Sequence, residues 1–325
     1  KNFYLTFFIK KINFIKIGIQ YPIFLNVIYK SLNNIINWKL FYILYETKFH
    51  LNAMSDEKIF IKNTHNQNNV KTIFLYFSTT EELISRPRRK GFTRVNYVFL
   101  NYDYLVADNI SINLFKSQQT KIKKYIKIGN IGADIILKNM KKKKIISNKG
   151  KLKINNKEKI ISFFDHSIGR DGVWDQSDYK NLLNNIYKIL KKYNFEIIYK
   201  SKKKKDELYK SFTTENKILF DKILRYKNFK YFEGGNKILS SYQIISISDL
   251  VITAPVSSII SETLSSSNKV LVYDPSGKYK SNRFFIRKMN ELYCKDENSF
   301  IIKLQKIIKM QKVKYSNKIY RNYII

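Results

Sequence analysis

The sequence predicts an α/β protein of two domains, each built on a parallel β-sheet with helices on both faces. Its 325 residues fill two domains at roughly 100–200 residues per domain. Apolar segments of strand length alternate with amphipathic helical segments, and this order produces parallel sheets. Polar turns follow several of the expected strands, which is where such sheets bind their ligands.

The composition fits a folded protein with a large positive charge. Lys and Arg number 61 against 25 Asp and Glu, giving a formal net charge of +36, while 44% of the residues are hydrophobic. That apolar share excludes a disordered tail. Lys, Asn, Ile and Tyr are the residues that an AT-rich genome favours through its codons. The charge therefore has two interpretations, codon bias or attraction to nucleotides, acidic lipid surfaces and nucleic acids.

Cysteine and histidine are scarce. The single cysteine, Cys294, cannot form an intramolecular disulfide, which fits a reducing compartment and excludes a disulfide-built secreted scaffold. Three histidines argue against a zinc cluster, and no Asp-x-Asp motif stands between the expected strands. We therefore expect no bound metal and no cofactor.

The N-terminal half reads as alternating helices and strands. Residues 40–45 (LFYILY) form a continuous apolar run, as in a strand that is covered on both faces, and Glu46 follows at its carboxyl end. The other expected elements are a basic amphipathic helix over 21–37, a helix over 49–63 and strands over 72–77, 97–100, 105–107 and 126–128.

A change in composition marks the expected domain boundary. Residues 139–156 contain the lysine run 141–144 and Gly150 but little apolar pattern. We place an N-terminal domain at 1–145 and a C-terminal domain at 157–325; the alternative is a long surface loop within one domain. Because the chain begins at Lys1 rather than Met, the N-terminal domain is expected to be incomplete at its start.

No segment has the pattern of a membrane span or a signal peptide. The longest uncharged stretch, residues 17–29, has 13 residues and contains Pro22, whereas a span needs about 20 residues. Its basic and aromatic surroundings suit either a helix buried in the N-terminal domain or a peripheral contact with a membrane surface.

The C-terminal half has a clearer pattern of alternating strands and helices. Helical spacing of apolar residues predicts a helix over 179–193, and a last helix is expected over 299–310 with an apolar face of Ile301, Ile302, Leu304, Ile307 and Ile308. The remaining expected elements are strands over 160–164, 195–199, 229–232, 250–253 and 270–273 and helices over 241–248 and 257–266.

The turn between the strand over 250–253 and the next helix is the most informative motif. The helix starts at two hydroxyl residues, Ser257 and Ser258, and the N–H groups and positive dipole end of such a helix bind anions. Glu262 lies one turn further on the same face, where its carboxylate could accept hydrogen bonds from two ribose hydroxyls. The alternative for the serines is plain N-capping.

Two further post-strand segments could contact phosphate. The loop over 165–172 contains Gly169 and Arg170, so its backbone could approach a diphosphate and the guanidinium would supply charge. An ordinary surface loop explains it equally well. Lys200 stands at the exit of the strand over 195–199, where its ammonium could neutralise a leaving nucleoside diphosphate.

Residues 248–264 resemble the nucleotide-binding strand, turn and helix of GT-B glycosyltransferases, which use nucleotide-activated sugars. The resemblance extends to residues 269–277 (KVLVYDPSG), similar to a pattern in surface-polysaccharide members, and to the basic residue after the strand over 195–199. It implies two Rossmann-like domains with parallel sheets facing across a cleft. The donor would bind the C-terminal domain and the acceptor the N-terminal one, with the last helix packing back on the N-terminal domain.

Glycosyl transfer with inversion requires a base for the acceptor hydroxyl and groups that stabilise the departing diphosphate. Glu46 is the favoured base, with Asp165 and His65 as further candidates and His166 as another residue that could line the cleft. The alternative for Glu46 is a carboxylate that complements the dipole at a helix start. The alternative for His65 is an exposed loop residue. We expect a metal-independent mechanism.

These inferences favour a bacterial, metal-independent glycosyltransferase that moves a sugar from a nucleotide-sugar donor to a surface polysaccharide, capsule or lipid-linked glycan. Such a protein would be cytoplasmic and could lie peripherally on the inner face of the membrane. The alternatives are a polyol-phosphate transferase of the teichoic-acid type, a nucleotide-sugar 2-epimerase and, from a different class, a nucleic-acid-binding protein suggested by charge alone. No recognised nucleic-acid module supports the last alternative.

Overall fold

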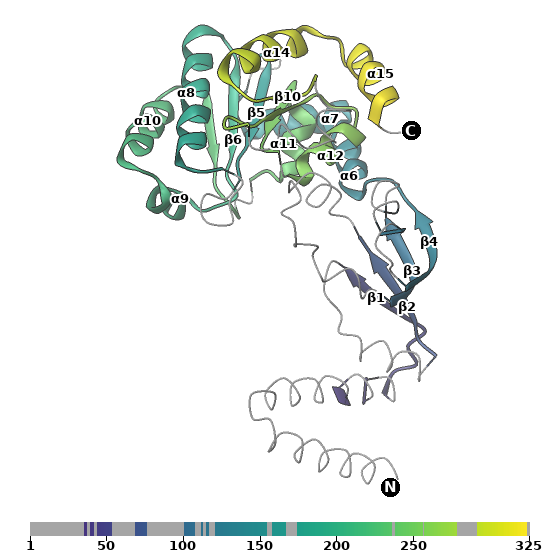
Figure 1. Ribbon diagram of the computed structural model, residues 1–325. Coiled ribbons are helices and arrows are strands. Elements are labelled where there is room, and N and C mark those ends of the chain that lie inside the picture. Colours follow the sequence, from purple (N-terminus) through teal and green to yellow (C-terminus); the bar gives the residue numbers. More distant parts are fainter. Residues whose placement is uncertain are drawn as a thin grey trace, which may run out of the picture. The chain divides into compact units, whose positions relative to one another are not determined.

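The chain forms two compact units in the computed structural model. They are an N-terminal unit (1–77 and 93–128) and a C-terminal unit (78–92 and 129–325); Figure 1 labels most of their elements. The structure describes residues 36–37, 40–41, 44–53, 69–76, 101–107, 112, 115–116, 121–154, 158–166, 174–235, 238–255, 257–277 and 291–323.

The described strands of the N-terminal unit form a parallel sheet in the order β1-β2-β3-β4. Phe74 stacks on Tyr102 with 5.0 Å between ring centroids, and Phe115 packs edge-on against Phe74. These rings form the buried core of the unit. The strands are β1 (Phe49–Ala53), β2 (Lys71–Leu75), β3 (Asn101–Ala107) and β4 (Lys121–Lys127).

The start of this sheet differs from the prediction. Leu40, Phe41 and Leu44, expected in a strand, are helical, and β1 occupies residues where a helix was expected. The prediction was wrong because a short apolar run does not distinguish a buried strand from a helix. These side chains are also exposed, Leu44 by 73%, so the run does not mark a strand covered on both faces.

The described strands of the C-terminal unit form a parallel sheet in the order β10-β9-β8-β5-β6-β7. Every residue of the central strand β5 is buried, as expected for a parallel strand covered on both faces. The predicted strands over 160–164, 229–232, 250–253 and 270–273 are confirmed. The strands are β5 (Ile160–Phe164), β6 (Glu196–Lys200), β7 (Phe229–Phe232), β8 (Leu250–Thr253), β9 (Val270–Tyr273) and β10 (Tyr293–Cys294).

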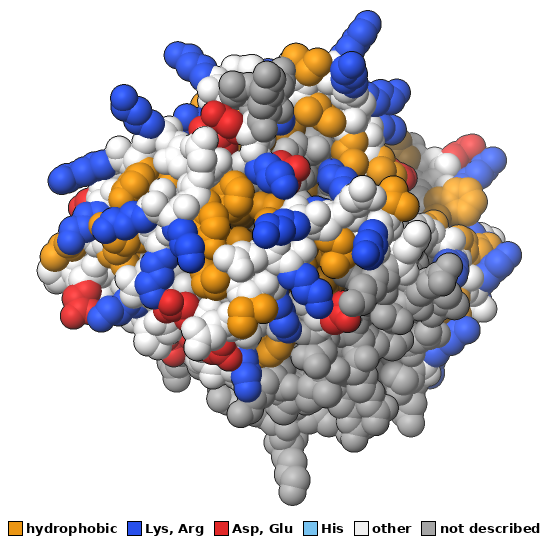
Figure 2. All heavy atoms as spheres, turned by 90° about the horizontal axis from the view of Figure 1, so that it is seen from above, with side chains coloured by type: hydrophobic (Ala, Val, Ile, Leu, Met, Phe, Trp, Pro, Cys, Tyr) orange, Lys and Arg blue, Asp and Glu red, His pale blue; other side chains and the backbone are white. Residues whose placement is uncertain are grey.

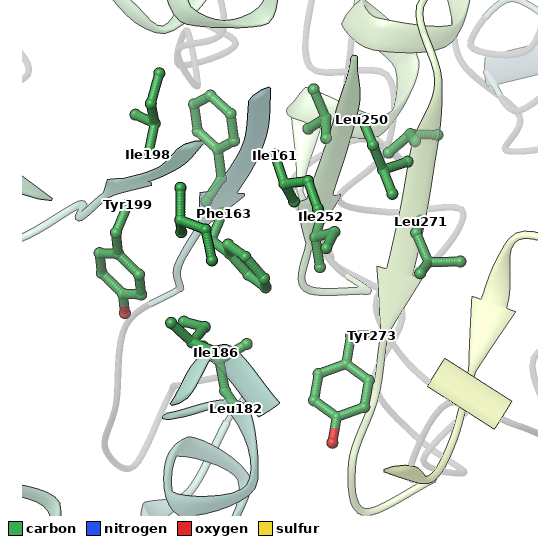
Figure 3. Packing of buried hydrophobic residues seen from close by; sticks show 14 of the residues in the cluster. Ile161, Phe163, Leu182, Ile186, Ile198, Tyr199, Leu250, Ile252, Leu271 and Tyr273 are labelled. Carbon is green, nitrogen blue, oxygen red and sulfur yellow. The ribbon is translucent and has the colours of Figure 1, made fainter. Parts of the chain in front are cut away.

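Helices cover this sheet on both sides (Figure 1). Figure 3 shows Leu182 and Ile186 of the predicted central helix packing beneath Phe163 of β5 and Ile252 of β8. The helices are α6 (Ile131–Asn139), α7 (Lys142–Lys151), α8 (Gln176–Lys192), α9 (Lys205–Ser211), α10 (Thr214–Leu224), α11 (Ser241–Ile247), α12 (Ser258–Ser265), α14 (Glu297–Lys309) and α15 (Lys312–Tyr323).

The boundary between the units lies at Ile128 and Gly129, earlier than the predicted linker over 139–156. The lysine run over 141–144 is not a linker, because all but its first residue lie within α7. Lysine is a good helix former, so a lysine-rich segment that docks a few apolar residues folds as a helix. Both α6 and α7 pack against α11 in the C-terminal unit.

The predicted last helix exists as α14, but it packs within the C-terminal unit, against β9 and β10. Its buried face contains Phe300, Leu304, Ile307 and Ile308, whereas Ile302 is 65% exposed. The expectation that this helix also packs on the N-terminal domain stays a prediction. Its apolar face is used by the sheet of its own unit.

The surface of the described residues is basic. Figure 2 shows Lys and Arg side chains spread over the visible face, with fewer acidic side chains and patches of hydrophobic ones between them. Within the described ranges, the structure contains no helix whose length and apolar character would suffice to cross a membrane. Of the predicted helix over 21–37, the structure describes residues 36–37, which are helical, and residues 21–35 lie outside the described residues.

Candidate active site

A cavity of about 310 Å³ opens at the carboxyl ends of the strands of the C-terminal sheet. From β5 the chain proceeds to β6 and β7 on one side, and it returns to β8 on the other side of β5. Such a reversal of strand order is where open α/β sheets bind their ligands. The lining residues are Phe164, Asp165, His166, Lys200, Ser201, Lys202, Gly234, Gly235, Ser241, Ser257, Ser258 and Ile259.

The start of α12 forms one wall of this cavity. Ser257 is its N-cap, and the Ser257 hydroxyl accepts a 3.3 Å hydrogen bond from the N–H of Ile259. The first turn contains no acidic residue, so its positive dipole end is not neutralised within the helix. Ser257 therefore caps the helix, and both serines also line the cavity. This arrangement suits an anion such as a phosphate.

Glu262 lies one turn further along α12. Burial raises the pKa of its carboxyl group, whereas a hydrogen bond from Ser258 opposes that shift. The side chain is half-buried beside Gly132 of α6 and Tyr242 of α11. Glu262 is not itself a lining residue of the cavity, but its hydrogen bond with Ser258 connects it to a residue that is.

Lys200 ends β6 and supplies positive charge to the cavity. Its Nζ donates a 2.8 Å hydrogen bond to the carbonyl oxygen of Glu233. Burial lowers the pKa of Lys200, and the charges of Asp165 and Glu233 oppose that shift. The contact holds the ammonium at the end of β6, and Lys200 lines the cavity.

Asp165 does not have the geometry of a general base. Its Oδ1 accepts from the backbone N–H of Lys202 at 2.6 Å. Its Oδ2 accepts from the hydroxyls of Tyr179 at 2.7 Å, Ser201 at 2.8 Å and Tyr199 at 3.3 Å. Both oxygens already have donors, so the expectation that Asp165 takes a substrate proton is not supported by its contacts. The carboxylate instead positions the loop that follows β6.

The loops after β6 and β7 are tightly joined. Gly234 donates its N–H to the carbonyl oxygen of Lys203 at 2.8 Å, and Ser201 donates to that of Phe232 at 2.8 Å. A Cβ atom on Gly234 would lie 2.2 Å from the carbonyl oxygen of Lys202. Only glycine allows this approach, which places Ser201 and Lys202 at the cavity.

Other predicted site residues are not brought together here. Glu46 precedes β1 and lines a separate, shallow hollow with residues that precede β2, at the amino edge of its sheet. The prediction that it emerges at the carboxyl edge is wrong, because Glu46 comes before β1 and the described residues of the preceding run, 40–41 and 44, are helical. His65, Gly169 and Arg170 lie outside the described residues.

Sequence reasoning missed Ser201, Gly234 and Ser241 as lining residues, and it favoured Lys200 over Lys202, which also lines the cavity. Each of them follows a strand or opens the next helix, so position after a strand was the available signal. His166 lines the cavity as the sequence suggested. In the part of the chain that the structure describes, His, Cys, Asp and Glu nowhere gather in threes that could hold a metal ion.

Two parallel α/β sheets in separate units, the second with a helix start at its switch point, have the architecture of the GT-B fold. The comparison with family models identifies the family. Residues 15–293 match the model of the polysaccharide biosynthesis PFTS motif proteins, and the chain belongs to that family.

Solved structures share the fold at low sequence identity. The wall teichoic acid polymerase TagF matches with a TM-score of 0.55 and 12% identity over 98% of this chain and 93% of that one. A putative UDP-N-acetylglucosamine 2-epimerase from Listeria monocytogenes matches with a TM-score of 0.58 and 12% identity, covering 89% and 73%. The UDP-GlcNAc 2-epimerase from Neisseria meningitidis, solved with UDP-GlcNAc, has a TM-score of 0.56 and 15% identity, covering 88% and 74%. No curated protein matches the sequence.

Proposed function

We propose that this chain is a metal-independent glycosyltransferase that moves a sugar from a nucleotide-sugar donor to a growing surface polysaccharide or lipid-linked glycan. The observation that carries the proposal is the placement of Ser257, Ser258 and Lys200 around one cavity at the switch point of the C-terminal sheet. Membership of a polysaccharide-biosynthesis family supports a growing glycan as the acceptor in this proposal.

In this proposal the cavity binds the diphosphate of the donor. The N–H groups at the start of α12 and the hydroxyls of Ser257 and Ser258 donate to phosphate oxygens, and Lys200 contributes a charge. These donors are held in place before the reaction, so they stabilise the negative charge that develops on the leaving diphosphate. Glu262 accepts hydrogen bonds from the ribose hydroxyls.

The proposed reaction also needs a proton acceptor. Asp165 accepts hydrogen bonds at both carboxylate oxygens and Glu46 precedes β1, whereas His166 is among the residues that line the cavity. A neutral imidazole can accept the proton of an acceptor hydroxyl at neutral pH. We therefore assign this role to His166 in the proposal, and His65 stays a prediction.

Product analysis separates the proposed activity from the two related ones. Glycosyl transfer releases a nucleoside diphosphate, whereas transfer of a polyol phosphate from a nucleoside diphosphate donor releases a nucleoside monophosphate. A 2-epimerase inverts the sugar carbon without releasing nucleotide. The likeness to TagF and to the epimerases makes these the relevant alternatives.

The experiment incubates the full chain with UDP-, GDP-, CDP- and ADP-linked donors and a lipid-linked glycan acceptor, and identifies the nucleotide product. We expect acceptor-dependent release of one nucleoside diphosphate, and its loss in Ser258→Ala and His166→Asn. Release of a monophosphate would establish the polyol-phosphate alternative, and donor inversion alone would establish the epimerase.

The positive charge has a place in this proposal. A cytoplasmic protein with a net charge of +36 is attracted to anionic lipid, where lipid-linked acceptors reside. Co-sedimentation with vesicles of phosphatidylglycerol, and not with neutral phosphatidylcholine vesicles, is the expected result. Steeply salt-dependent binding to RNA or DNA without nucleotide binding would favour the nucleic-acid alternative instead.

A further inference from the structure

We propose that Asn130 and Gly132 are positioning residues for Glu262, so that the donor site extends to the segment where the chain enters the C-terminal unit. The inference rests on the proposed role of Glu262 as the ribose contact. Gly129 is the first residue of the C-terminal unit after the N-terminal sheet, and α6 begins two residues later. The segment thus connects the N-terminal sheet to a wall of the donor site.

Gly132 allows α6 to approach Glu262 closely. A Cβ atom at this position would lie 2.9 Å from Cγ of Glu262, 3.0 Å from Cε1 of Tyr242 and 3.1 Å from Oδ1 of Asn130. Glycine is otherwise unfavourable in a helix, where alanine is the best residue. The close approach gives a physical reason for glycine here.

Asn130 connects the same segment to α12. Its Oδ1 accepts the N–H of Ala133 at 3.1 Å and so caps α6, while its Nδ2 donates to the hydroxyl of Ser261 at 3.3 Å. That hydroxyl in turn donates to the carbonyl oxygen of Ser258 at 2.9 Å. A continuous hydrogen-bonded path therefore runs from the start of α6 to the N-terminus of α12 at the cavity.

Tyr242 completes the surroundings of Glu262. Burial raises the pKa of the Tyr242 hydroxyl, and the nearby charge of Glu262 raises it further. The Glu262 side chain is thus confined by α6, α11 and its own helix. A confined Glu262 side chain has few rotamers in the ligand-free protein, so it loses little conformational freedom when ribose binds. Such preorganisation raises the affinity for the ligand.

The coupling between residues 129–132 and nucleotide binding is reciprocal. If these residues hold Glu262 in its binding geometry, a nucleotide bound by Glu262 must stabilise them by the same free energy. The amide of Ala133 reports this directly, because its hydrogen bonds go to Asn130. Amide hydrogen exchange at residues 130–134 should therefore slow when the nucleotide binds.

The test compares Gly132→Ala with Gly129→Ala in the full chain, using the nucleoside diphosphate that the product assay identifies. A Cβ at Gly129 meets nothing within 4 Å, so that variant is a matched control from the same segment. We expect Gly132→Ala to raise the dissociation constant roughly tenfold and Gly129→Ala to leave it unchanged. Equal affinity in the two variants overturns the proposal.

A second comparison separates this inference from the proposed role of Glu262. In a Glu262→Ala background the side chain that Gly132→Ala displaces is absent, so the further loss should shrink to about twofold or less. The same tenfold loss in that background overturns the inference. If Glu262→Ala alone leaves affinity unchanged, the ribose role is what fails.

Hydrogen exchange keeps the proposal testable if Gly132→Ala does not fold. In the wild-type protein, nucleotide should slow exchange at Ala133, and Asn130→Ala should remove that effect and weaken nucleotide binding. An amide exchange rate at Ala133 that is the same with and without nucleotide overturns the coupling.

Discussion

The hydroxyl of Tyr179 in α8 donates a 2.7 Å hydrogen bond to the carboxylate of Asp165, which follows β5 and lines the cavity. Burial raises the pKa of Asp165, and hydrogen bonds from Tyr179, Ser201, Lys202 and Tyr199 oppose the shift. Burial also raises the pKa of the Tyr179 hydroxyl well above its usual value, with the charge of Asp165 adding to the effect. The pair joins the core of the C-terminal unit to the loop at its ligand-binding edge.

Replacing Tyr179 by Phe should destabilise the fold. The variant keeps the ring but leaves the buried carboxylate with one donor fewer, and such hydrogen bonds to charged groups contribute about 1.5–3 kcal/mol. We expect the free energy of unfolding, measured by urea denaturation, to fall by that amount. Tyr187→Phe is the control, because that half-buried ring packs on Tyr226 and its hydroxyl bonds to the exposed Lys191 rather than to a buried carboxylate; it should change the free energy of unfolding by less than about 0.5 kcal/mol. An unchanged free energy of unfolding in Tyr179→Phe would contradict the stabilising role of this hydrogen bond.

Gly234→Ala should disturb the cavity through the backbone. The added Cβ would lie 2.2 Å from the carbonyl oxygen of Lys202, and backbone cannot rotate away as a side chain can. We expect a loss of at least about 2 kcal/mol in unfolding free energy and weaker nucleotide binding. Gly150→Ala, where the Cβ meets nothing within 4 Å, should cost nothing. If both variants behave alike, the two loops are not held by this contact.

Lys200→Met tests the charge at the strand exit. The substitution keeps much of the aliphatic stem and removes the ammonium, so nucleoside diphosphate affinity should fall roughly 10–100-fold, the scale of a charge-assisted hydrogen bond. Titration calorimetry at two salt concentrations should also show a weaker salt dependence. Lys204→Met, at the exposed start of α9, is the control with little expected effect. Unchanged affinity in Lys200→Met would remove this residue from the site.

The pH dependence of Glu262 has a defined sign. Burial raises its pKa above the ordinary value of 4.5, so nucleotide affinity should fall with acid at a higher pH than for an exposed glutamate. The stability of the ligand-free protein should change oppositely: the contribution of Glu262 is fully present below pH 4.5 and is lost as the pH rises through the raised pKa. Affinity and thermal unfolding measured from about pH 4 to 8 should show these opposite slopes, and Glu262→Gln should lack both. Parallel slopes would contradict the assignment.

The C-terminal fold was predictable because its strands are short apolar runs bounded by polar turns. Residues 160–164 and 250–253 could be assigned to strands, and the helical spacing around Leu182 and Ile186 could be read without tertiary information. Residues 40–45 gave the same local signal but fold as helix where the structure describes them. The opposite error occurred at the lysine run before Ile145. Its high charge indicated a linker, but the segment forms helix α7, which packs on α11.

The site was predictable only in part, for a physical reason. Ser257 and Ser258 follow a strand and begin a helix, so their position at a sheet edge is a local property of the chain. The four donors to Asp165 and the closeness of Gly132 to Glu262 arise from segments that are distant in sequence. No local pattern reports such contacts, and Asp165 was therefore assigned to catalysis rather than to positioning.

The proposed function requires the cavity at the ends of β5 and β8 to bind the nucleoside diphosphate of the donor. The decisive measurement is a crystal structure of the full chain with that nucleotide. We predict that the phosphates contact the start of α12 at Ser257 and Ser258, with Lys200 beside them and the ribose hydroxyls on Glu262. A diphosphate bound elsewhere on the chain, with this cavity occupied by solvent, would contradict the account.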